Sequence, residues 1–355
     1  PRIDYTDGTG SLLLEPQSTN LVGYSLPNNT NWGKGSNTTI TENYAASPDG
    51  TQNASRLVMP TGSGTYVFYQ FTAASTTDHT LSFYAKNNGG DADVTMAFFA
   101  ASQTQNITLT NEWQRFEFTT SITSGNTVQV GVDNITSVDM LIFGVQCEAL
   151  PYATSYIPTS GSSVTRNADV CNNAGSSDLI NSTEGVLYAE ISTLANDGTN
   201  RLISLSDGTA DERLFLQYSS TDNRLQFLVK NSGSTQCNII YDASNLTAVH
   251  KVAAKYKLND FALWVDGVEV GTDTSGNVAS GLNKLQFDRG YSGLPFYGNV
   301  RSVAVFKEAL TDEELAKITS TTQQEVFYEM RDKMLQINAD YYEFGDYTTR
   351  LKKLF

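Results

Sequence analysis

Short runs in which apolar and polar residues alternate dominate the first half of the chain. The alternation is clearest where every second residue is apolar, at Leu81, Phe83 and Ala85, and again at Val128, Val130 and Val132. Alternation of this kind over a few residues predicts half-buried β-strands, and turn sequences rich in Pro, Gly, Asn and Asp separate the runs. We therefore predict an antiparallel β-sandwich over residues 23–150, in which the apolar run Met140–Val145 is a central strand covered on both faces.

A second set of strand-like runs covers residues 176–320. The dipeptide Asp266-Gly267 separates two of them and favours a type I′ hairpin, because Gly accepts the positive φ of that turn. From Thr311 the pattern becomes helical, and Glu314 three residues later completes a capping-box sequence. Residues 151–175 contain two prolines and many Ser, Thr and Asn, which is typical of a linker. The predicted fold class is all-β, with two tandem antiparallel β-sandwiches of jelly-roll type and a C-terminal amphipathic helix.

The two ends of the chain differ from the sandwiches. Residues 1–22 are predicted to be a lead-in arm with one apolar patch, Leu12–Leu14. Residues 321–355 are predicted to be a helical segment, because apolar side chains recur there every three or four residues. The apolar stripe of this helix either docks on the second domain or pairs with copies from other subunits. The chain starts at Pro1 rather than Met, so we expect a processed or partial chain.

The composition supports the all-β prediction and limits the partners. The chain has 17 Phe and 18 Tyr, and such aromatic content argues against disorder. A formal net charge of -15 argues against nucleic acid or an anionic membrane as a partner. No apolar run approaches the roughly 18 residues that span a bilayer. The acidity keeps the protein soluble; the alternative is that some carboxylates bind Ca²⁺, with Asp207, Asp211 and Asp242 as the candidates.

No catalytic motif is evident in the sequence. The two histidines, His79 and His250, have no obvious Ser or Cys partner, and the acidic groups Asp211-Glu212 and Asp312–Glu314 fit a loop and a helix start. The spacing of paired carboxylates on one strand that glycoside hydrolysis needs is missing. We therefore expect a protein that is not an enzyme. The three cysteines, Cys147, Cys171 and Cys237, are expected to be free thiols, with a Cys171–Cys237 bridge as the alternative.

Several motifs resemble bacteriophage tail-fibre and related virion surface proteins. They are the opening PRIDY…SLLLEPQSTNL, and a junction formed by Gln146-Cys147-Glu148, Ala153–Thr159 and Val164-Thr165-Arg166. The sequence departs from the family pattern at Cys147 and at Leu150-Pro151, which affects the local turn. In the second half, LWVDGVEVG and FYGNVRSVAVFKEALTDEELAKI resemble the penultimate hairpin and the closing strand and helix of a laminin-G or concanavalin-like lectin domain.

The resemblance implies a carbohydrate-binding-module-like sandwich over 23–150 and a laminin-G/concanavalin-like sandwich over 176–320. It implies adhesion from the virion surface, on a tail or fibre, to a bacterial surface polysaccharide. The implied partners include other virion proteins and copies of the chain, with a trimer favoured. Two alternatives stay open: a structural virion or decoration protein without a ligand, and the glycan-binding modules of a secreted bacterial protein.

Glycan binding needs exposed aromatic rings with hydrogen-bonding side chains nearby. In the first half the candidates are Trp32, Tyr66, Tyr69 and Trp113, each of which is otherwise a core or rim residue. In the second half Trp264 either lines the concave sheet or belongs to a core. The loop 288–293 supplies Arg289 and Tyr291, which otherwise form an ordinary polar turn.

Overall fold

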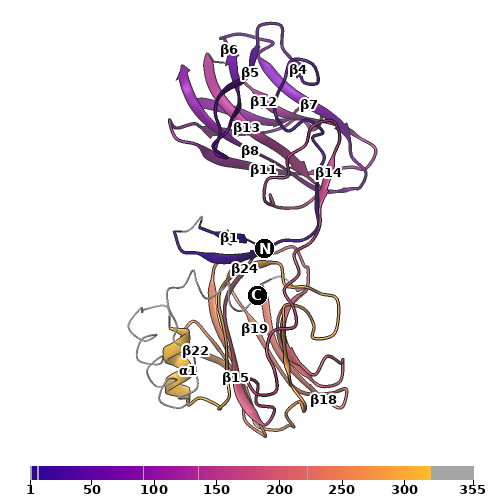
Figure 1. The fold of residues 1–355 in the computed structure, drawn as a ribbon, viewed down its shortest axis with the longest axis vertical. Coiled ribbons are helices and arrows are strands. Elements are labelled where there is room, and N and C mark those ends of the chain that lie inside the picture. The colour runs from indigo at the N-terminus through magenta and orange to yellow at the C-terminus, as the bar shows by residue number, and fades with distance from the viewer. Residues whose placement is uncertain (1, 6–7, 91, 135, 222, 321–355) are drawn as a thin grey trace. The chain divides into compact units, whose positions relative to one another are not determined.

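The computed structural model describes residues 2–5, 8–90, 92–134, 136–221 and 223–320. The chain divides into two compact units, and each is an antiparallel β-sandwich (Figure 1). The first sandwich comprises residues 16–168. The second combines the described residues up to Glu15 with those from Asp169 to Ser320. The predicted fold class, tandem all-β sandwiches, is confirmed. No helix among the described residues has the length and apolar character to cross a membrane.

The first sandwich consists of two five-stranded sheets and a strand pair. One sheet has the order β10 (Gln103–Thr108), β9 (Asp93–Phe98), β12 (Thr127–Asp133), β7 (Tyr66–Thr72) and β4 (Gly33–Lys34). The facing sheet has the order β11 (Gln114–Ile122), β8 (Thr77–Gly90), β13 (Val138–Glu148), β6 (Gln52–Met59) and β5 (Thr39–Ala46). A short 3-10 helix, η1 (Phe99–Ala101), follows β9. Strands β3 (Ser18–Asn20) and β14 (Val164–Arg166) form the additional pair.

The core of the first sandwich follows the alternation in the sequence. The inward residues of β8 and β12 are buried together between the two sheets, as predicted: Leu81, Phe83, Ala85, Val128, Val130 and Val132. Strand β13 lies between β8 and β6 and is buried over nearly its whole length. The prediction of a central strand at Met140–Val145, covered on both faces, is therefore confirmed.

The second sandwich packs a seven-stranded sheet against a five-stranded one. The larger sheet has the order β1 (Arg2–Asp4), β2 (Ser11–Leu14), β24 (Gly298–Phe306), β15 (Glu184–Thr193), β20 (His250–Lys257), β21 (Phe261–Val265) and β22 (Val268–Asp273). The smaller sheet has the order β19 (Ser234–Asp242), β18 (Arg224–Asn231), β17 (Arg213–Tyr218), β16 (Arg201–Ser206) and β23 (Lys284–Gln286).

The domain boundaries differ from those predicted. The first residues do not form a lead-in arm: β2 pairs with β24 through Leu12 and Val300, and Leu12 and Leu14 are buried in the core of the second sandwich. The first sandwich is thus inserted between β2 and the rest of the second. An apolar patch needs a core to bury it, and strand β24 offers both that core and unpaired backbone groups. Sequence proximity alone had associated the patch with the first domain.

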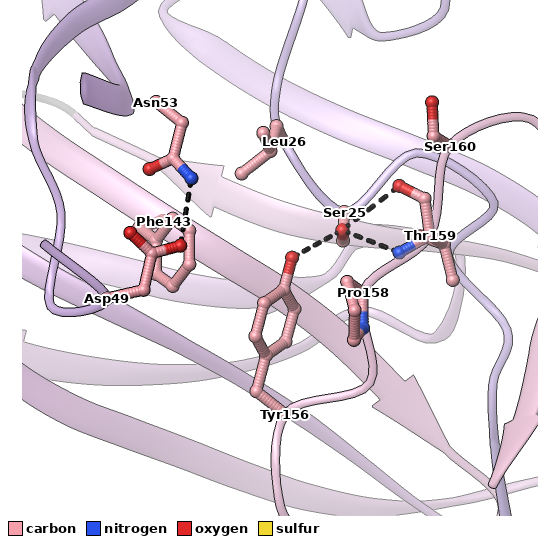
Figure 2. Close-up of a pocket in the computed structure, with 9 residues that line it drawn as sticks. All are labelled: Ser25, Leu26, Asp49, Asn53, Phe143, Tyr156, Pro158, Thr159 and Ser160. Atoms are coloured by element: carbon pink, nitrogen blue, oxygen red, sulfur yellow. Dashed lines mark hydrogen bonds between the residues drawn. The ribbon is translucent and has the colours of Figure 1, made fainter. Parts of the chain in front are cut away.

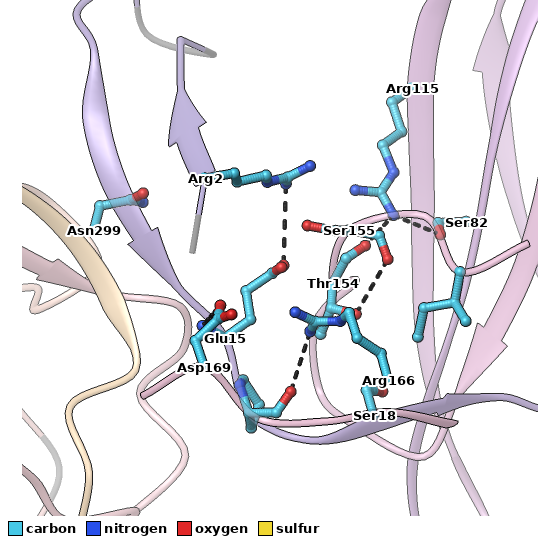
Figure 3. Close-up of polar contacts among 12 residues, drawn as sticks. Arg2, Glu15, Ser18, Ser82, Arg115, Thr154, Ser155, Arg166, Asp169 and Asn299 are labelled. Carbon is cyan, nitrogen blue, oxygen red and sulfur yellow. Dashed lines mark hydrogen bonds and ion pairs between the residues drawn. The ribbon is translucent and has the colours of Figure 1, made fainter. Parts of the chain in front are cut away.

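The predicted linker 151–175 is also divided between the two units. Residues 151–168 belong to the first sandwich, where the Arg166 guanidinium donates to the carbonyl oxygen of Pro16 at 3.1 Å (Figure 3). Asp169 belongs to the second, where it accepts a hydrogen bond from the Glu15 backbone N–H at 2.9 Å. The segment therefore consists of ordered parts of two domains rather than a spacer.

Two local predictions in the second sandwich are confirmed. Asp266 and Gly267 have φ of +50° and +87°, the positive values that a type I′ turn requires, and they connect β21 to β22. Helix α1 (Asp312–Thr319) begins after Thr311, whose side chain accepts from the Glu314 backbone N–H while the Glu314 side chain accepts from the Thr311 backbone. Helix α1 packs on β20, β21 and β22 (Figure 1). The predicted helix over 321–355 lies outside the described residues.

The three cysteines provide a chemical test of the two cores. Cys147 is buried in the first sandwich, Cys171 and Cys237 are buried in the second, and all three are free thiols. Burial raises the pKa of Cys171 and of Cys237 to about 12, and it raises the pKa of Cys147 as well. We expect no thiol to react with Ellman's reagent at pH 8 in the native protein and three to react in denaturant without reductant. Fewer than three reactive thiols in denaturant would indicate a disulfide.

A cross-strand ion pair makes the stability of the first sandwich depend on pH. Arg56 on β6 binds Asp139 on β13 through two hydrogen bonds of 2.8 and 2.5 Å. The Arg56 hydrogen bond lowers the pKa of Asp139, with a further contribution from Asn88. A carboxyl whose pKa falls on folding stabilises the fold above its unfolded-state value of about 3.9, and this contribution is lost as pH falls through the folded-state pKa.

We expect Asp139→Asn to lower the free energy of unfolding by about 1 kcal/mol at pH 7. The difference from wild type should disappear as the pH falls below both pKa values, as measured by urea denaturation. Asp242→Asn is the matched control: it also removes an Arg–Asp pair, but the Asp242 side chain is 64% exposed against 20% for Asp139. A loss that persists at low pH would mean that packing, not charge, holds this position.

Candidate functional site

The outer face of β13 carries a buried polar network in the first sandwich. The Glu148 side chain is fully buried and its carboxyl oxygens accept four hydrogen bonds. The donors are the Ser18 hydroxyl at 2.5 Å, the Gln146 amide at 2.6 Å, and both the backbone N–H and the hydroxyl of Thr154. A buried carboxyl group is stable only when its acceptor capacity is used in this way.

The same network fixes the segment that follows. Gln146 accepts from the Ile157 backbone N–H at 2.7 Å, and the Asn20 amide donates to the Ile157 carbonyl at 2.9 Å. The Tyr156 ring packs edge-on against Phe143 with centroids 5.1 Å apart. On the other side of the segment, the Arg115 guanidinium donates to the Thr154 carbonyl and to Ser82 (Figure 3). The junction motif of the sequence is therefore a structural clamp that places residues 154–160 on the sheet.

The clamped segment forms one wall of a groove in the first sandwich (Figure 2). The groove has a volume of about 260 Å³ and is lined by Ser25, Leu26, Asp49, Asn53, Phe143, Tyr156, Pro158, Thr159 and Ser160. A smaller hollow of about 150 Å³ shares part of this lining and adds Tyr24, Asn28, Glu42 and Asn43. The lining thus combines rings and aliphatic surface with amide and carboxylate groups.

Two polar residues of the groove have contrasting hydrogen-bond states. Asp49 accepts hydrogen bonds from Thr51, Ser47 and Asn53, which hold its pKa well below the usual value, with the Thr51 hydroxyl as the largest contributor. Asp49 therefore stays an acceptor at any ordinary pH. The Asn53 amide donates to Asp49 at 2.9 Å, but its buried Oδ1 has no partner among the described residues. Because this oxygen is buried, a bound water would satisfy it.

A second surface of the first sandwich carries aromatic rings on an open sheet. Along β7, Val67 faces the core, so Tyr66 and Phe68 lie on the outer face with Phe99 of η1. The three rings are half-buried, with centroids 5.9 to 6.1 Å apart. We call Tyr66, Phe68 and Phe99, with their neighbours on this side of the sheet, the aromatic face.

The strands beside β7 leave room around Phe68. Its partners in register are Gly33 on β4 and Gly131 on β12. A Cβ on Gly33 would stand 2.3 Å from Phe68 Cζ, so the ring occupies the space that a side chain would take. Beside the rings, the Gln129 amide donates to Gln70 at 2.9 Å. Rings next to paired amides on an exposed sheet form a surface that suits sugars.

Two of the tryptophans considered as ligand contacts are buried. Trp32 is 5% exposed, donates to the Tyr24 carbonyl at 2.9 Å and packs on Tyr69, so it belongs to the core. Trp264 is 8% exposed and lies in a small cluster with Leu315 of α1. It does not line the concave sheet, because α1 covers that face of β21, and the alternative prediction that it belongs to a core is confirmed. Neither ring can stack on a ligand.

The other predicted residues have different positions. Tyr66 belongs to the aromatic face, whereas Tyr69 points to the opposite side and packs against the core. Trp113 is half-buried with Lys86 Nζ 5.4 Å from its ring. Tyr291 and Arg289 do lie together, with the guanidinium carbon 4.4 Å from the ring centroid. Phe68, Phe99 and the groove were not predicted from the sequence. The alternation of Tyr66, Phe68 and Gln70 along one strand is the signal that would have identified Phe68.

The three predicted Ca²⁺ ligands are not brought together. Asp207 and Asp211 lie on the loop between β16 and β17, where Asp207 accepts from the Thr209 backbone N–H at 2.7 Å. Asp242 ends β19 and pairs with Arg224, at the opposite end of the sheet from Arg213. Within the described part of the chain, no group of three His, Cys, Asp or Glu residues is arranged to hold a metal.

The acidic residues and histidines considered for catalysis hold local structure. Glu212 accepts the backbone N–H groups of Ser232 and Ser280 at 2.8 and 2.6 Å. His250 contacts Asp266 at 2.6 Å and the Asn245 carbonyl at 2.7 Å. His79 is fully buried, with its Nδ1 3.0 Å from the Thr77 carbonyl. Each group has a structural role in a turn or a strand.

Residues 176–316 match a laminin G family model described as the concanavalin A-like lectin/glucanases superfamily. The second sandwich is similar to this superfamily. The expected laminin-G/concanavalin-like character of these residues is thus confirmed. The description covers both lectins and glucanases, so the match alone does not distinguish binding from hydrolysis.

No curated protein matches the chain. Several solved structures share weak likeness. The CBM40 domain of the Ruminococcus gnavus IT-sialidase, bound to α2,3-sialyllactose, is 17% identical over 43% of this chain and 95% of its own, with a TM-score of 0.36. A pentraxin from Limulus polyphemus is 13% identical over 43% and 74%, with a TM-score of 0.33. Domains LG4-5 of the mouse laminin α1 chain are 11% identical over 81% and 96%, with a TM-score of 0.28. Likeness this weak does not bear on what the chain binds.

The clamp makes a testable contribution to stability. We expect Glu148→Gln to lower the free energy of unfolding by about 3 kcal/mol, because an amide donor would face the donors of Gln146 and Thr154 inside the protein. Urea denaturation would measure the change. Glu117→Gln, at an exposed position of β11, is the control and should change stability little. Equal stability of the Glu148 variant and wild type would show that the network does not hold the segment.

Proposed function

We propose that the protein binds carbohydrate without catalysis, and that the first sandwich does so on the aromatic face. The observation that carries the proposal is the outward placement of Tyr66 and Phe68 on a sheet whose neighbouring strands present glycine beside Phe68. Three partly exposed rings gathered on one face of a sheet form a candidate contact surface for a ligand. The flat C–H surface of a sugar ring covers an aromatic ring well.

The polar residues around the rings are suited to hydrogen-bond with the hydroxyl groups of a sugar. Gln70 and Gln129 on one side, and Thr95 and Asn106 on the other, form hydrogen-bonded pairs on adjacent strands. Each side chain keeps further donor or acceptor capacity for ligand hydroxyls. A rigid sheet holds these groups in place before binding, which reduces the entropy that association would otherwise cost.

The groove of Figure 2 supplies a second contact region in the same sandwich. Its Asn53 Oδ1 needs a donor, and Asp49 remains ionised beside it. The rings of Tyr156 and Phe143 contribute apolar surface. The hydroxyls of Ser25 and Tyr156, however, are already bonded to one another at 2.6 Å. For this reason the aromatic face is the principal site in our proposal.

The biological setting we propose is the surface of a virion of tail-fibre type, where the ligand is a bacterial surface polysaccharide. The motifs of the opening segment and the junction support this setting through their resemblance to such proteins. Repeated weak sites in an oligomer would give useful avidity. The alternative role, a structural virion protein without a ligand, predicts no glycan binding at all.

A bacterial glycan array followed by calorimetry would test the proposal. We expect Phe68→Ala to weaken binding of the selected glycan about tenfold, which corresponds to about 1.4 kcal/mol, a reasonable value for one aromatic contact. EDTA should have no effect. Tyr44→Ala is the matched control, because Tyr44 is 42% exposed on the opposite sheet.

The outcomes separate three cases. Loss of binding in Asn53→Ala with normal binding in Phe68→Ala would move the site to the groove. Equal losses in Phe68→Ala and Tyr44→Ala would indicate nonspecific adsorption. A wild-type protein that binds no glycan would overturn carbohydrate binding in favour of the structural role.

A further inference from the structure

Two arginines of the second sandwich converge on one tyrosine. Arg213 begins β17, and Arg289 lies on the loop between β23 and β24. Their guanidinium carbons are 5.0 and 4.4 Å from the centroid of the Tyr291 ring. Arg213 also lies over Phe215, at 5.0 Å. Arg213, Arg289 and Tyr291 therefore form one cluster.

Neither guanidinium has a carboxylate partner among the described residues. Arg213 donates to the carbonyl oxygens of Ala210 and Arg289, at 3.1 and 2.5 Å, and Arg289 donates through Nε to the Ser292 carbonyl. These bonds use Nε of both residues and Nη1 of Arg213. The remaining guanidinium N–H groups have no acceptor within the described part of the chain. An Arg fork is suited to bind a carboxylate or a phosphate in two-point fashion.

The arrangement is unfavourable without a counter-ion. Arg213 is 8% exposed, and burial lowers its pKa, with the charge of Arg289 adding to the effect and Tyr291 and Asp211 opposing it. The chain as a whole has 38 acidic residues against 23 basic ones. In a chain so rich in carboxylates, two neighbouring cations without one are notable. An anion bound between the two guanidinium groups would offset both the desolvation cost of Arg213 and the repulsion between the two positive charges.

Hydrogen bonds to buried residues hold the loop that presents Arg289 and Tyr291. The Gly290 backbone N–H donates to buried Asp288 at 2.7 Å, and Ser206 donates to the Gly290 carbonyl at 2.6 Å. Gly290 has φ of +97°, and a Cβ there would stand 3.0 Å from Ser206 Cβ, so the position requires glycine. Tyr291 keeps 37% of its surface exposed on this rigid loop. The site is therefore formed before any ligand arrives.

We propose that Arg213, Arg289 and Tyr291 form a subsite for the anionic group of an acidic saccharide, with the Tyr291 ring against the sugar. The inference rests on the proposed carbohydrate binding and adds the ligand's charge and a second binding region. The anionic group is a carboxylate, a sulfate or a phosphate, all of which accept from an arginine fork. Because the net charge of -15 repels polyanions in general, attraction must come from this local cluster.

The test compares charged and neutral forms of the same saccharide on the full chain by calorimetry. The probes are oligogalacturonate and its carboxyl-reduced form, dextran sulfate and dextran, and a glycan bearing phosphomonoester groups with its dephosphorylated form. We expect wild type to bind at least one charged form about tenfold more tightly than its neutral counterpart. We expect Arg289→Gln, which replaces the guanidinium by an uncharged polar amide, to abolish that preference.

Two controls protect the interpretation. Arg224→Gln removes a guanidinium from the same sheet that is already paired with Asp242, and it should leave the preference intact. Tyr291→Phe keeps the ring, so it should bind as wild type does, whereas Tyr291→Ala should weaken binding. Binding of a neutral glycan that depends on Phe68 should be unchanged in Arg289→Gln.

Each contrary result has one meaning. If Arg289→Gln retains the preference, or Arg224→Gln loses it equally, the subsite is wrong while carbohydrate binding by the first sandwich stands. The subsite is also wrong if neutral forms bind wild type as tightly as charged ones. If no saccharide binds wild type, both the subsite and the proposed function fail. A loss of preference confined to Arg289→Gln among the arginine variants supports the assignment.

Discussion

The buried Glu148 carboxyl group is the interaction on which the organisation of the first sandwich depends. Its four donors come from three parts of the chain: the entering strand β3, the central strand β13 and the segment at Thr154. An unsatisfied carboxyl group at this depth would cost several kcal/mol, so all three parts must be in place together. The same contacts put β14 beside β3, which brings the outgoing chain next to the incoming one. Because the chain leaves the first sandwich next to the place where it entered, the residues before and after this sandwich can fold together into the second sandwich.

The insertion shapes the second sandwich and its folding. Strand β2 pairs with β24 in the larger sheet, although Leu14 and its partner Gly298 lie 284 positions apart in the sequence. Such distant pairing carries a loop-closure cost that rises with the length of the intervening chain. The two sandwiches then offer different surface chemistry. The first presents half-buried rings beside paired amides, and the second presents two arginines that have no carboxylate partner among the described residues.

Much of the fold was predictable because it depends on local chemistry. Alternation identified β8 and β12, and a continuous apolar run identified β13. The Asp266-Gly267 turn and the Thr311 capping box depend on residues only a few positions apart. The candidate site was predicted less well. Trp32 and Trp264 were chosen for their chemistry, but whether a ring on a strand faces solvent depends on what covers that face, and α1 covers Trp264. Tyr66, Arg289 and Tyr291 are in positions that suit binding, whereas Phe68 and the groove were not anticipated.

By itself, the sequence determined the fold class, the central strand, and the turn and helix signals. Each of these follows from side-chain periodicity or from a backbone preference within a few residues. Only the tertiary structure decided that Leu12–Leu14 belong to the second sandwich, that the motif at Gln146–Glu148 acts as a clamp, and that Arg213 meets Arg289. These facts depend on pairings between residues far apart in the chain. No local pattern encodes them, because many distant partners satisfy the same apolar or polar requirement and only the packed fold selects one.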